Sequence, residues 1–354
     1  MDTTKLIVDV DTGIDDSLAL LFLLANAEAE ILGIASTAGN VPAQQVAANN
    51  LAWLDLCRSP DIEVAVGSPV PLVIPLRTTE DTHGPQGIGH AVLPRSDRTV
   101  SSRSAAQLWV DLARENAGVA VGLVTGPLTN LALAVRAEPE LPSLLRRLVI
   151  MGGAFNYAGN TTPTTEWNIS VDPEAAKVVF DAFGAADRRP IVCALDLTET
   201  IAMTPDHVRR LAQRAGSAPE EAIAETDAST VRSQASNPVV RHFSDAVRFY
   251  MEFHRDHQQG FIAHMHDPFA AAVALDPGLV QTRPATVDVE LAGTLTRGMT
   301  VADWAGMWGR RPNAEIACRT DPAAFFEMLI ERVGAFAGRL YPGAGVPHKH
   351  RRRR

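Results

Sequence analysis

The chain has 354 residues, of which 46% are hydrophobic and 21% are charged, and this composition excludes a disordered or fibrous protein. The formal net charge is −9 although Lys349 and the four residues Arg351–Arg354 crowd basic charge at the end, so the body is more acidic still. An acidic body repels a polyanion, and we therefore expect no nucleic-acid partner.

The beginning of the chain, MDTTKLIVDVD, lacks the basic segment, the apolar segment and the cleavage site of a secretory signal. The longest apolar stretch, residues 18–27, is too short to span a bilayer. Cys57, Cys193 and Cys318 are odd in number and lack metal-ligand spacing, which is typical of reduced thiols. These features predict a cytoplasmic protein with no membrane partner.

Short apolar runs of β type recur along the chain, and most of them precede a helical pattern. We expect strands at residues 6–10, 31–35, 119–124, 148–151, 191–195, 285–291 and 314–318. Helices are expected to begin at Asp172-Pro173, Thr204-Pro205 and Asp321-Pro322, because each pair joins an N-cap residue to proline at the first helical position. The alternation predicts an α/β fold, with a mostly parallel central sheet, flanking helices and a Rossmann-like core.

The domain organisation is expected to be simple, since neither an internal repeat nor a low-complexity linker interrupts the pattern. Residues 1–345 are interpreted as a single domain, and residues 346–354 as a basic, disordered tail. The polar stretch at residues 215–237 is the best candidate for a long surface excursion, which would be a lid or an interface.

The most informative segment is Asp9-Val10-Asp11-Thr12-Gly13-Ile14-Asp15-Asp16, which lies between a predicted strand and an apolar helix. Capping of the helix would explain Asp15 and Asp16, but it leaves the other two carboxylates unexplained. By the period of two, Asp9 and Asp11 point to the same side of the strand and would both end near the turn. Four crowded carboxylates need a cation or hydrogen-bond donors to compensate their charge, and hard oxygen ligands of this kind suit calcium or magnesium.

This turn resembles the Asp-x-Asp-x-Gly-x-Asp-Asp motif of the nucleoside hydrolases, and further segments match that family in the same order. They are Ala38-Gly39-Asn40-Val41, His83-Gly84, Thr125-Gly126-Pro127-Leu128-Thr129-Asn130, Met151-Gly152-Gly153-Ala154, Glu166-Trp167-Asn168-Ile169, Asp172-Pro173-Glu174-Ala175-Ala176 and His266-Asp267-Pro268. The resemblance implies the nucleoside hydrolase fold, a homo-oligomer (dimer or tetramer), and hydrolysis of the N-glycosidic bond of a ribonucleoside to ribose and free base.

The resemblance also implies a role for each matched residue. Calcium would be held by Asp11, Asp16, Asp267 and the carbonyl of Thr125, and Asp11 would be the general base that activates water. His266 would be the acid that protonates the departing base, and His83 would line the base pocket. The residues implied in substrate binding at the ribose are Asp15, Asn40, Met151, Asn160, Glu166 and Asn168.

Several alternatives stay open at this point. Asp9-Val10-Asp11-Thr12 after a strand also resembles the nucleophile turn of haloacid-dehalogenase-like phosphohydrolases, and a non-catalytic nucleoside-binding protein would keep the same fold. Uridine and inosine fit His83 and His266 best, while cytidine remains open. His264 is a secondary pocket candidate, and Tyr157 would pack on a loop or touch the nucleoside. No role is assigned to the remaining histidines in helical stretches, which are His207, His242, His254 and His257.

Overall fold

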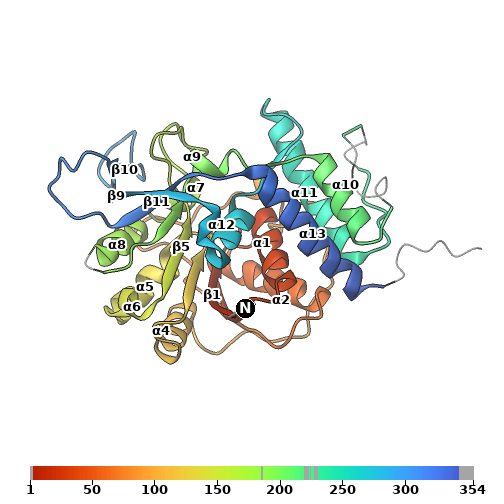
Figure 1. Ribbon diagram of the computed structural model, residues 1–354, viewed down its shortest axis with the longest axis horizontal. Helices are drawn as coiled ribbons and strands as arrows, with labels where there is room; N and C mark the ends of the chain where they lie inside the picture. Colours follow the sequence, from red (N-terminus) through yellow and green to blue (C-terminus); the bar gives the residue numbers. More distant parts are fainter. Residues whose placement is uncertain (1–2, 185, 219–222, 224, 227–229, 343–354) are drawn as a thin grey trace, which may run out of the picture.

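The computed structural model describes residues 3–184, 186–218, 223, 225–226 and 230–342 (Figure 1). The predicted basic tail therefore lies outside the described residues, and so does part of the expected excursion at residues 215–237. Within the described ranges, no helix combines the length and the apolar character needed to cross a bilayer.

The centre of the molecule is a nine-stranded sheet with the strand order β10-β9-β11-β6-β5-β4-β1-β2-β3. Seven neighbouring strands are mutually parallel, and β9 is antiparallel to both of its neighbours, β11 and the edge strand β10. A separate antiparallel pair joins β7 to β8. The strands are β1 (Thr4–Val10), β2 (Ala29–Ser36), β3 (Glu63–Val66), β4 (Val121–Val124), β5 (Arg147–Met151), β6 (Ile191–Cys193), β7 (Ala202–Met203), β8 (Ala263–His264), β9 (Gln281–Val289), β10 (Thr300–Asp303) and β11 (Ala314–Arg319).

Helices cover both faces of this sheet, and each face has its own hydrophobic core. One core contains α4 (Ala105–Glu115), α5 (Thr129–Ala137), α6 (Leu141–Leu144) and α8 (Pro173–Phe183). The other contains α1 (Ile14–Ala25), α2 (Ala43–Leu56), α10 (Pro205–Arg214), α11 (Pro238–Asp256), α12 (His266–Leu275) and α13 (Pro322–Leu340). Three short helices, α3 (Glu80–His83), α7 (Trp167–Val171) and α9 (Leu195–Thr198), lie in the connections, and a 3₁₀ turn spans Pro277–Leu279.

The central strand β1 shows why the sheet is buried on both sides. Its side chains alternate, so that Leu6 and Val8 belong to the core under α1 while Ile7 belongs to the core under α4. A strand that is covered on both faces reads as a continuous apolar run, and such a run predicted this strand. The expected α/β class and the mostly parallel sheet are confirmed.

The predicted helix starts at Pro173, Pro205 and Pro322 are confirmed, but most strand boundaries differ from the prediction by one to four residues. Two of these differences have a clear physical reason. The run expected as one strand at 191–195 ends at Cys193, and Leu195 begins α9. A short apolar run cannot separate a strand from a buried helix. The strand expected at 285–291 is β9, which begins at Gln281 because four exposed residues pair with β11 before the apolar part starts.

The sheet topology determines where a ligand can bind. The chain runs from β1 outward through β2 to β3, and then returns to place β4 on the other side of β1. The connection after β1 and the connection after β4 therefore lead to opposite faces of the sheet. Open α/β sheets bind ligands in the crevice between two such connections. The segment with four aspartates follows directly after β1.

Candidate active site

A cavity of about 640 Å³ opens at the carboxyl ends of the parallel strands, within the size range of small-molecule sites. Among the site residues predicted from the sequence, Asp16 and the secondary pocket candidate His264 are absent from its lining. Those that line it are Asp11, Asp15, Asn40, His83, Thr125, Met151, Asn160, Glu166, Asn168, His266 and Asp267. The structure thus brings together residues that are up to 256 positions apart in the chain.

The turn between β1 and α1 is shaped by close contacts that leave no room for side chains. Gly13 is the N-cap of α1, and a Cβ at this position would lie 2.5 Å from Asn40 Nδ2. A Cβ on Gly39 would lie 2.1 Å from Asp11 Oδ2. These two glycines therefore let the loop after β2 approach the aspartates.

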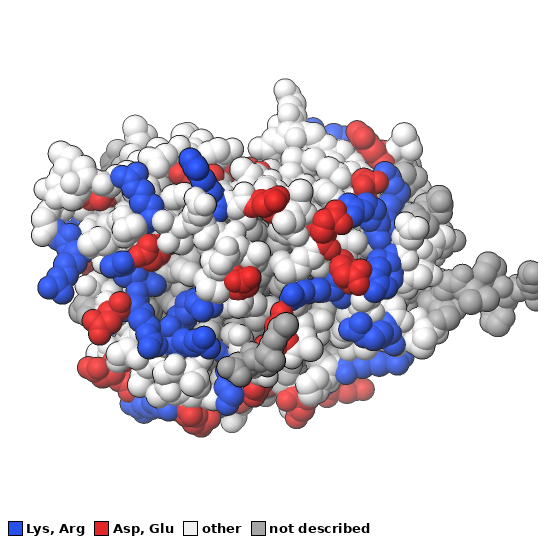
Figure 2. Space-filling view, in the orientation of Figure 1, with Lys and Arg blue, Asp and Glu red and all other residues white. Residues whose placement is uncertain are grey.

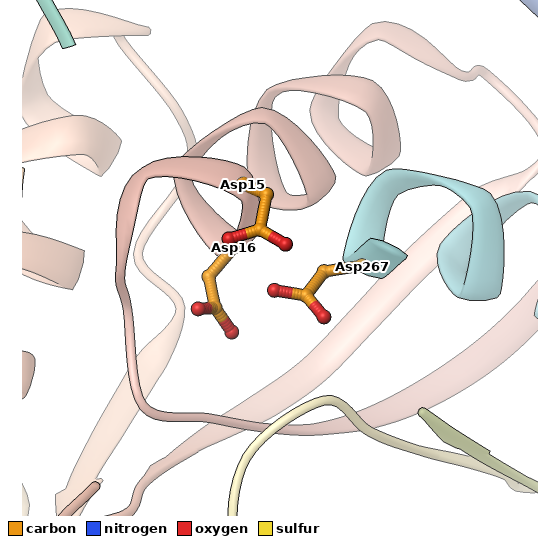
Figure 3. Close-up of side chains that lie close together, drawn as sticks. All are labelled: Asp15, Asp16 and Asp267. Carbon is orange, nitrogen blue, oxygen red and sulfur yellow. The ribbon is translucent and has the colours of Figure 1, made fainter. Parts of the chain in front are cut away.

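Asp15, Asp16 and Asp267 form a buried acidic cluster whose carboxylate oxygens lie within 4.8 Å of one another. Figure 3 shows the three side chains turned toward one another, two from the first turn of α1 and one from α12. Burial, followed by the charge of Asp16, raises the pKa of Asp15 to about 7. Burial likewise raises the pKa of Asp16 and, more strongly, that of Asp267.

Asp11 lies beside this cluster and lines the cavity. Its Oδ2 accepts a hydrogen bond of 2.9 Å from the backbone N–H of Asn40, which holds the carboxylate in place. Burial and the charge of Asp16 raise its pKa well above the usual range. Like charges at this spacing are stable only when a cation or protons neutralise them.

The arrangement passes a test for a hard divalent cation. Asp16 is fixed by hydrogen bonds from the Gly13 N–H (2.8 Å) and the Thr125 hydroxyl (2.7 Å), so its position does not depend on a metal. The amide oxygen Asn40 Oδ1 is buried and has no hydrogen-bond partner among the described residues. An acceptor without a donor, next to several carboxylates, matches the oxygen-rich ligand set of calcium or magnesium.

Asn168 holds the carbonyl groups at the ends of two neighbouring strands. Its amide Nδ2 donates to the carbonyl of Thr125 at 2.6 Å and to that of Met151 at 3.3 Å. The amide therefore positions the Thr125 carbonyl, which the family resemblance implies as a metal ligand, in addition to lining the cavity.

Glu166 has a structural position that the sequence did not predict. It is the N-cap of α7, where Oε1 accepts from the Asn168 N–H at 2.8 Å and Oε2 accepts from the N–H groups of Ile169 and Gly153, both at 3.0 Å. Asn160 similarly uses Oδ1 to accept from the Trp167 N–H at 2.9 Å. Both side chains tie the loop after β5 to α7 while they line the cavity.

The two predicted histidines are held by different helices, α1 and α9. His83 Nδ1 accepts from the Ile14 N–H at 3.1 Å, which puts its ring hydrogen on Nε2, and burial lowers its pKa to about 3. His266 Nδ1 lies 2.7 Å from the hydroxyl of Thr198 in α9. Burial, and then the neighbouring His264, lower the pKa of His266 well below the usual range.

Sequence reasoning missed a group of cavity residues on α11 and the segment after it. Tyr250, Phe253, His254, His257 and Gln259 all line the cavity. Tyr250, His254 and His257 lie at positions i, i+4 and i+7, so their spacing already indicated one helix face. What the spacing did not indicate is that this face turns toward the cavity.

The structure corrects the expectation for Asp9. Its carboxylate lies away from the cavity and accepts hydrogen bonds from Trp109 Nε1 (2.7 Å), Asn130 Nδ2 (3.1 Å) and the hydroxyl of Thr37. Alternation sends Asp9 toward α4, but β1 ends at Val10, so alternation no longer determines the direction of Asp11. Asp9 is therefore a buried structural carboxylate, and its neighbours explain its burial.

Fold and cavity together define an α/β enzyme with a buried acidic centre at the topological switch point. A model of the family "Inosine-uridine preferring nucleoside hydrolase" matches residues 6–327. This chain belongs to that nucleoside hydrolase family, and it is an N-ribohydrolase that acts on N-glycosyl bonds. Membership in this family removes the haloacid-dehalogenase-like alternative.

Individual relatives agree with this assignment. The chain is 36% identical over 334 residues to the pyrimidine-specific ribonucleoside hydrolase RihA of Salmonella gallinarum, an alignment that covers 94% of this chain and 99% of the relative. A solved purine-preferring ribonucleoside hydrolase from Gardnerella vaginalis has a TM-score of 0.83 at 30% identity, covering 95% and 99% of the two chains. A solved inosine-guanosine nucleoside hydrolase has a TM-score of 0.80 at 28% identity, with coverage of 93% and 98%.

Proposed function

We propose that this enzyme hydrolyses ribonucleosides, with uridine and inosine preferred, by means of a calcium ion held at the acidic cluster. The observation that carries the proposal is the position of Asp11, which lines the cavity directly beside Asp15, Asp16 and Asp267. A carboxylate at this place can take a proton from water that attacks the anomeric carbon. Asp11 is accordingly the general base.

The metal ligands in this proposal are Asp11, Asp16, Asp267 and the carbonyl of Thr125. The clustering of Asp15 with Asp16 and Asp267 makes Asp15 a further candidate ligand, besides its proposed contact with the ribose. When bound, a calcium ion supplies positive charge that makes the attacking water more acidic. The protein supplies the orientation, since Asn168 and the Gly13 N–H hold the ligand groups in place.

Ribose binding is assigned to one wall of the cavity, with Asn40, Met151, Asn160, Glu166 and Asn168 as its lining. Carboxylate and amide oxygens there accept hydrogen bonds from hydroxyl groups. They also face the positive charge that develops on the sugar ring as the N-glycosidic bond breaks. Groups whose hold strengthens as this charge grows lower the barrier.

The departing base is assigned to the opposite wall, where His266 is the acid and His83 is a lining residue. Three aromatic groups on α11, Tyr250, Phe253 and His254, enlarge this wall and suit a flat heterocycle. The names of the relatives include both pyrimidine-specific and purine-preferring enzymes, so the preference for uridine and inosine rests on the cavity residues alone.

A small neutral substrate also agrees with the surface. Figure 2 shows Lys and Arg side chains interspersed with Asp and Glu over the face in view, without a continuous basic field. A cytoplasmic location and assembly as a homo-oligomer complete the proposal; both come from the sequence pattern and the family resemblance.

The decisive experiment measures reducing ribose released from uridine, inosine, cytidine, guanosine and 2′-deoxyuridine, before and after chelation and calcium replacement. We expect release from uridine and inosine to be fastest, to stop on chelation and to return with calcium. Loss of the 2′-hydroxyl should lower kcat/KM by at least about 10²-fold, since binding at the sugar is used in the transition state. A protein that binds nucleosides without releasing ribose would contradict the proposal.

A further inference from the structure

Glu199 is a cavity residue that neither the sequence nor the proposed reaction uses. It directly follows α9, and its side chain is 17% exposed. The preceding residue, Thr198, contacts His266, so Glu199 lies on the wall assigned to the departing base. Its charge is also among the causes that raise the pKa of the Tyr157 and Tyr250 hydroxyls, after burial, so Glu199 lies near both residues.

The carboxylate of Glu199 is half-buried, and among the described residues its one polar contact is with His264. Burial raises its pKa. Glu166 and Asp172, by contrast, each accept several hydrogen bonds. Burying a carboxylate with so few donors is costly, so a donor supplied by a ligand would recover a large part of that cost.

One neighbour limits how Glu199 can point. His264 Nε2 lies 3.1 Å from Oε2, and burial lowers the pKa of His264 to about 4, so this ring carries no charge near neutral pH. His264 in turn stacks on His266, with ring centroids 5.5 Å apart. The imidazole therefore occupies one carboxylate oxygen and leaves Oε1 for the cavity.

The chemistry of nucleobases indicates what Oε1 would meet. A base whose glycosidic nitrogen is near His266 and the acidic cluster extends its opposite edge across the cavity wall. Uracil has N3–H on this edge and hypoxanthine has N1–H, whereas their methylated forms have no donor there. A carboxylate only accepts hydrogen bonds, and thus distinguishes these forms.

We infer that Glu199 is a specificity-determining residue, whose carboxylate accepts a hydrogen bond from a ring N–H of the nucleobase on the edge opposite the glycosidic bond. This inference rests on the proposed function and adds the substrate class: ribonucleosides whose base carries an N–H donor on that edge. The ribose wall contributes nothing to this selection, because the sugar is the same in all of these substrates.

The test compares uridine with 3-methyluridine, and inosine with 1-methylinosine, as kcat/KM ratios. The wild-type enzyme is expected to favour the unmethylated member of each pair by about 10- to 100-fold, the range for a hydrogen bond to a charged group. Glu199→Ala should bring both ratios close to one, because it removes the acceptor and makes room for the methyl group. Glu199→Gln has a single acceptor oxygen, for which His264 and the base compete, so its ratios should fall between those of the wild type and those of Glu199→Ala.

Glu30→Ala is the matched control, since Glu30 is exposed at the start of β2 and does not line the cavity. It should keep the wild-type ratios. The inference is overturned if the wild-type enzyme hydrolyses both members of each pair equally, a result that needs no variant to fold. It is also overturned if Glu199→Ala retains the wild-type ratios. If the wild-type enzyme releases ribose from no nucleoside, the proposed function itself has failed.

Discussion

The hydroxyl of Thr198 lies 2.7 Å from Nδ1 of His266, and this contact joins α9 to the first residue of α12. Both side chains are buried, so water does not compete for the contact. The hydroxyl fixes the orientation of the ring through Nδ1 and leaves Nε2 for the departing base. A donor to the departing base needs such a fixed orientation.

Thr198→Val should therefore lower kcat for uridine by about 3- to 10-fold, since one hydrogen bond is lost while the shape is kept. His266→Ala should lower it by about 10²- to 10⁴-fold. Both variants should keep a much larger fraction of the wild-type kcat on a nitrophenyl riboside than on uridine, because a nitrophenolate leaves without a proton. Equal losses on both substrates would make His266 a ribose-binding or structural residue instead of the acid.

Asp11→Ala removes the proposed base and a proposed metal ligand together. We expect ribose release to fall to near background while the far-ultraviolet circular dichroism stays that of the wild type. Asp9→Asn, which changes a carboxylate outside the cavity, is the matched comparison and should keep measurable turnover. If Asp11→Ala retained a tenth of the wild-type kcat, Asp11 would not be the base.

Asn168→Ala should weaken calcium binding although Asn168 is not itself a proposed ligand. Its side chain donates to the Thr125 carbonyl at 2.6 Å, and loss of this bond frees the carbonyl to turn away. Outer partners of metal ligands typically contribute about 10- to 100-fold in metal affinity. Isothermal titration with calcium measures the effect, and an unchanged Kd would confine Asn168 to the ribose.

Glu166→Gln should destabilise the fold as well as slow the reaction. Each carboxylate oxygen of Glu166 accepts from backbone N–H groups, and the new amide group would present N–H donors to one of these positions. Leaving buried donors unpaired costs about 1–3 kcal/mol. Urea unfolding should report a loss of this size, and an unchanged midpoint would show that the cap is not structurally important.

His207 gives a pH dependence of stability that lies outside the cavity. Its ring stacks on Phe326 with centroids 4.1 Å apart, Nδ1 accepts from the Thr204 N–H, and burial lowers its pKa. The unfolded state then binds the proton more readily than the folded state. The folded state is therefore destabilised as the pH falls through about 6.5, the pKa of an unperturbed histidine. His207→Gln should show a smaller drop in Tm between pH 7.5 and 5.5 than the wild type; an equal drop would contradict it.

The central strands and the first site motif were predictable because their signals are local. An apolar run buried on both faces indicated β1, and the proline-marked caps located α8, α10 and α13. Asp11, Asp15 and Asp16 were identifiable because they crowd a single turn after a strand. The resemblance to a known family then added the residues of the loops after β2, β4 and β5.

Only the tertiary structure decided which side chains share the cavity. Asp9 and Asp11 are two residues apart, yet the end of β1 sends one toward Trp109 and the other into the cavity. Tyr250 and His254 reach the site because α11 packs against α1 and α3, and no local pattern encodes the direction of a helix face. Glu199 was not identified from the sequence, because its contact with His264 joins two segments that are far apart in the chain.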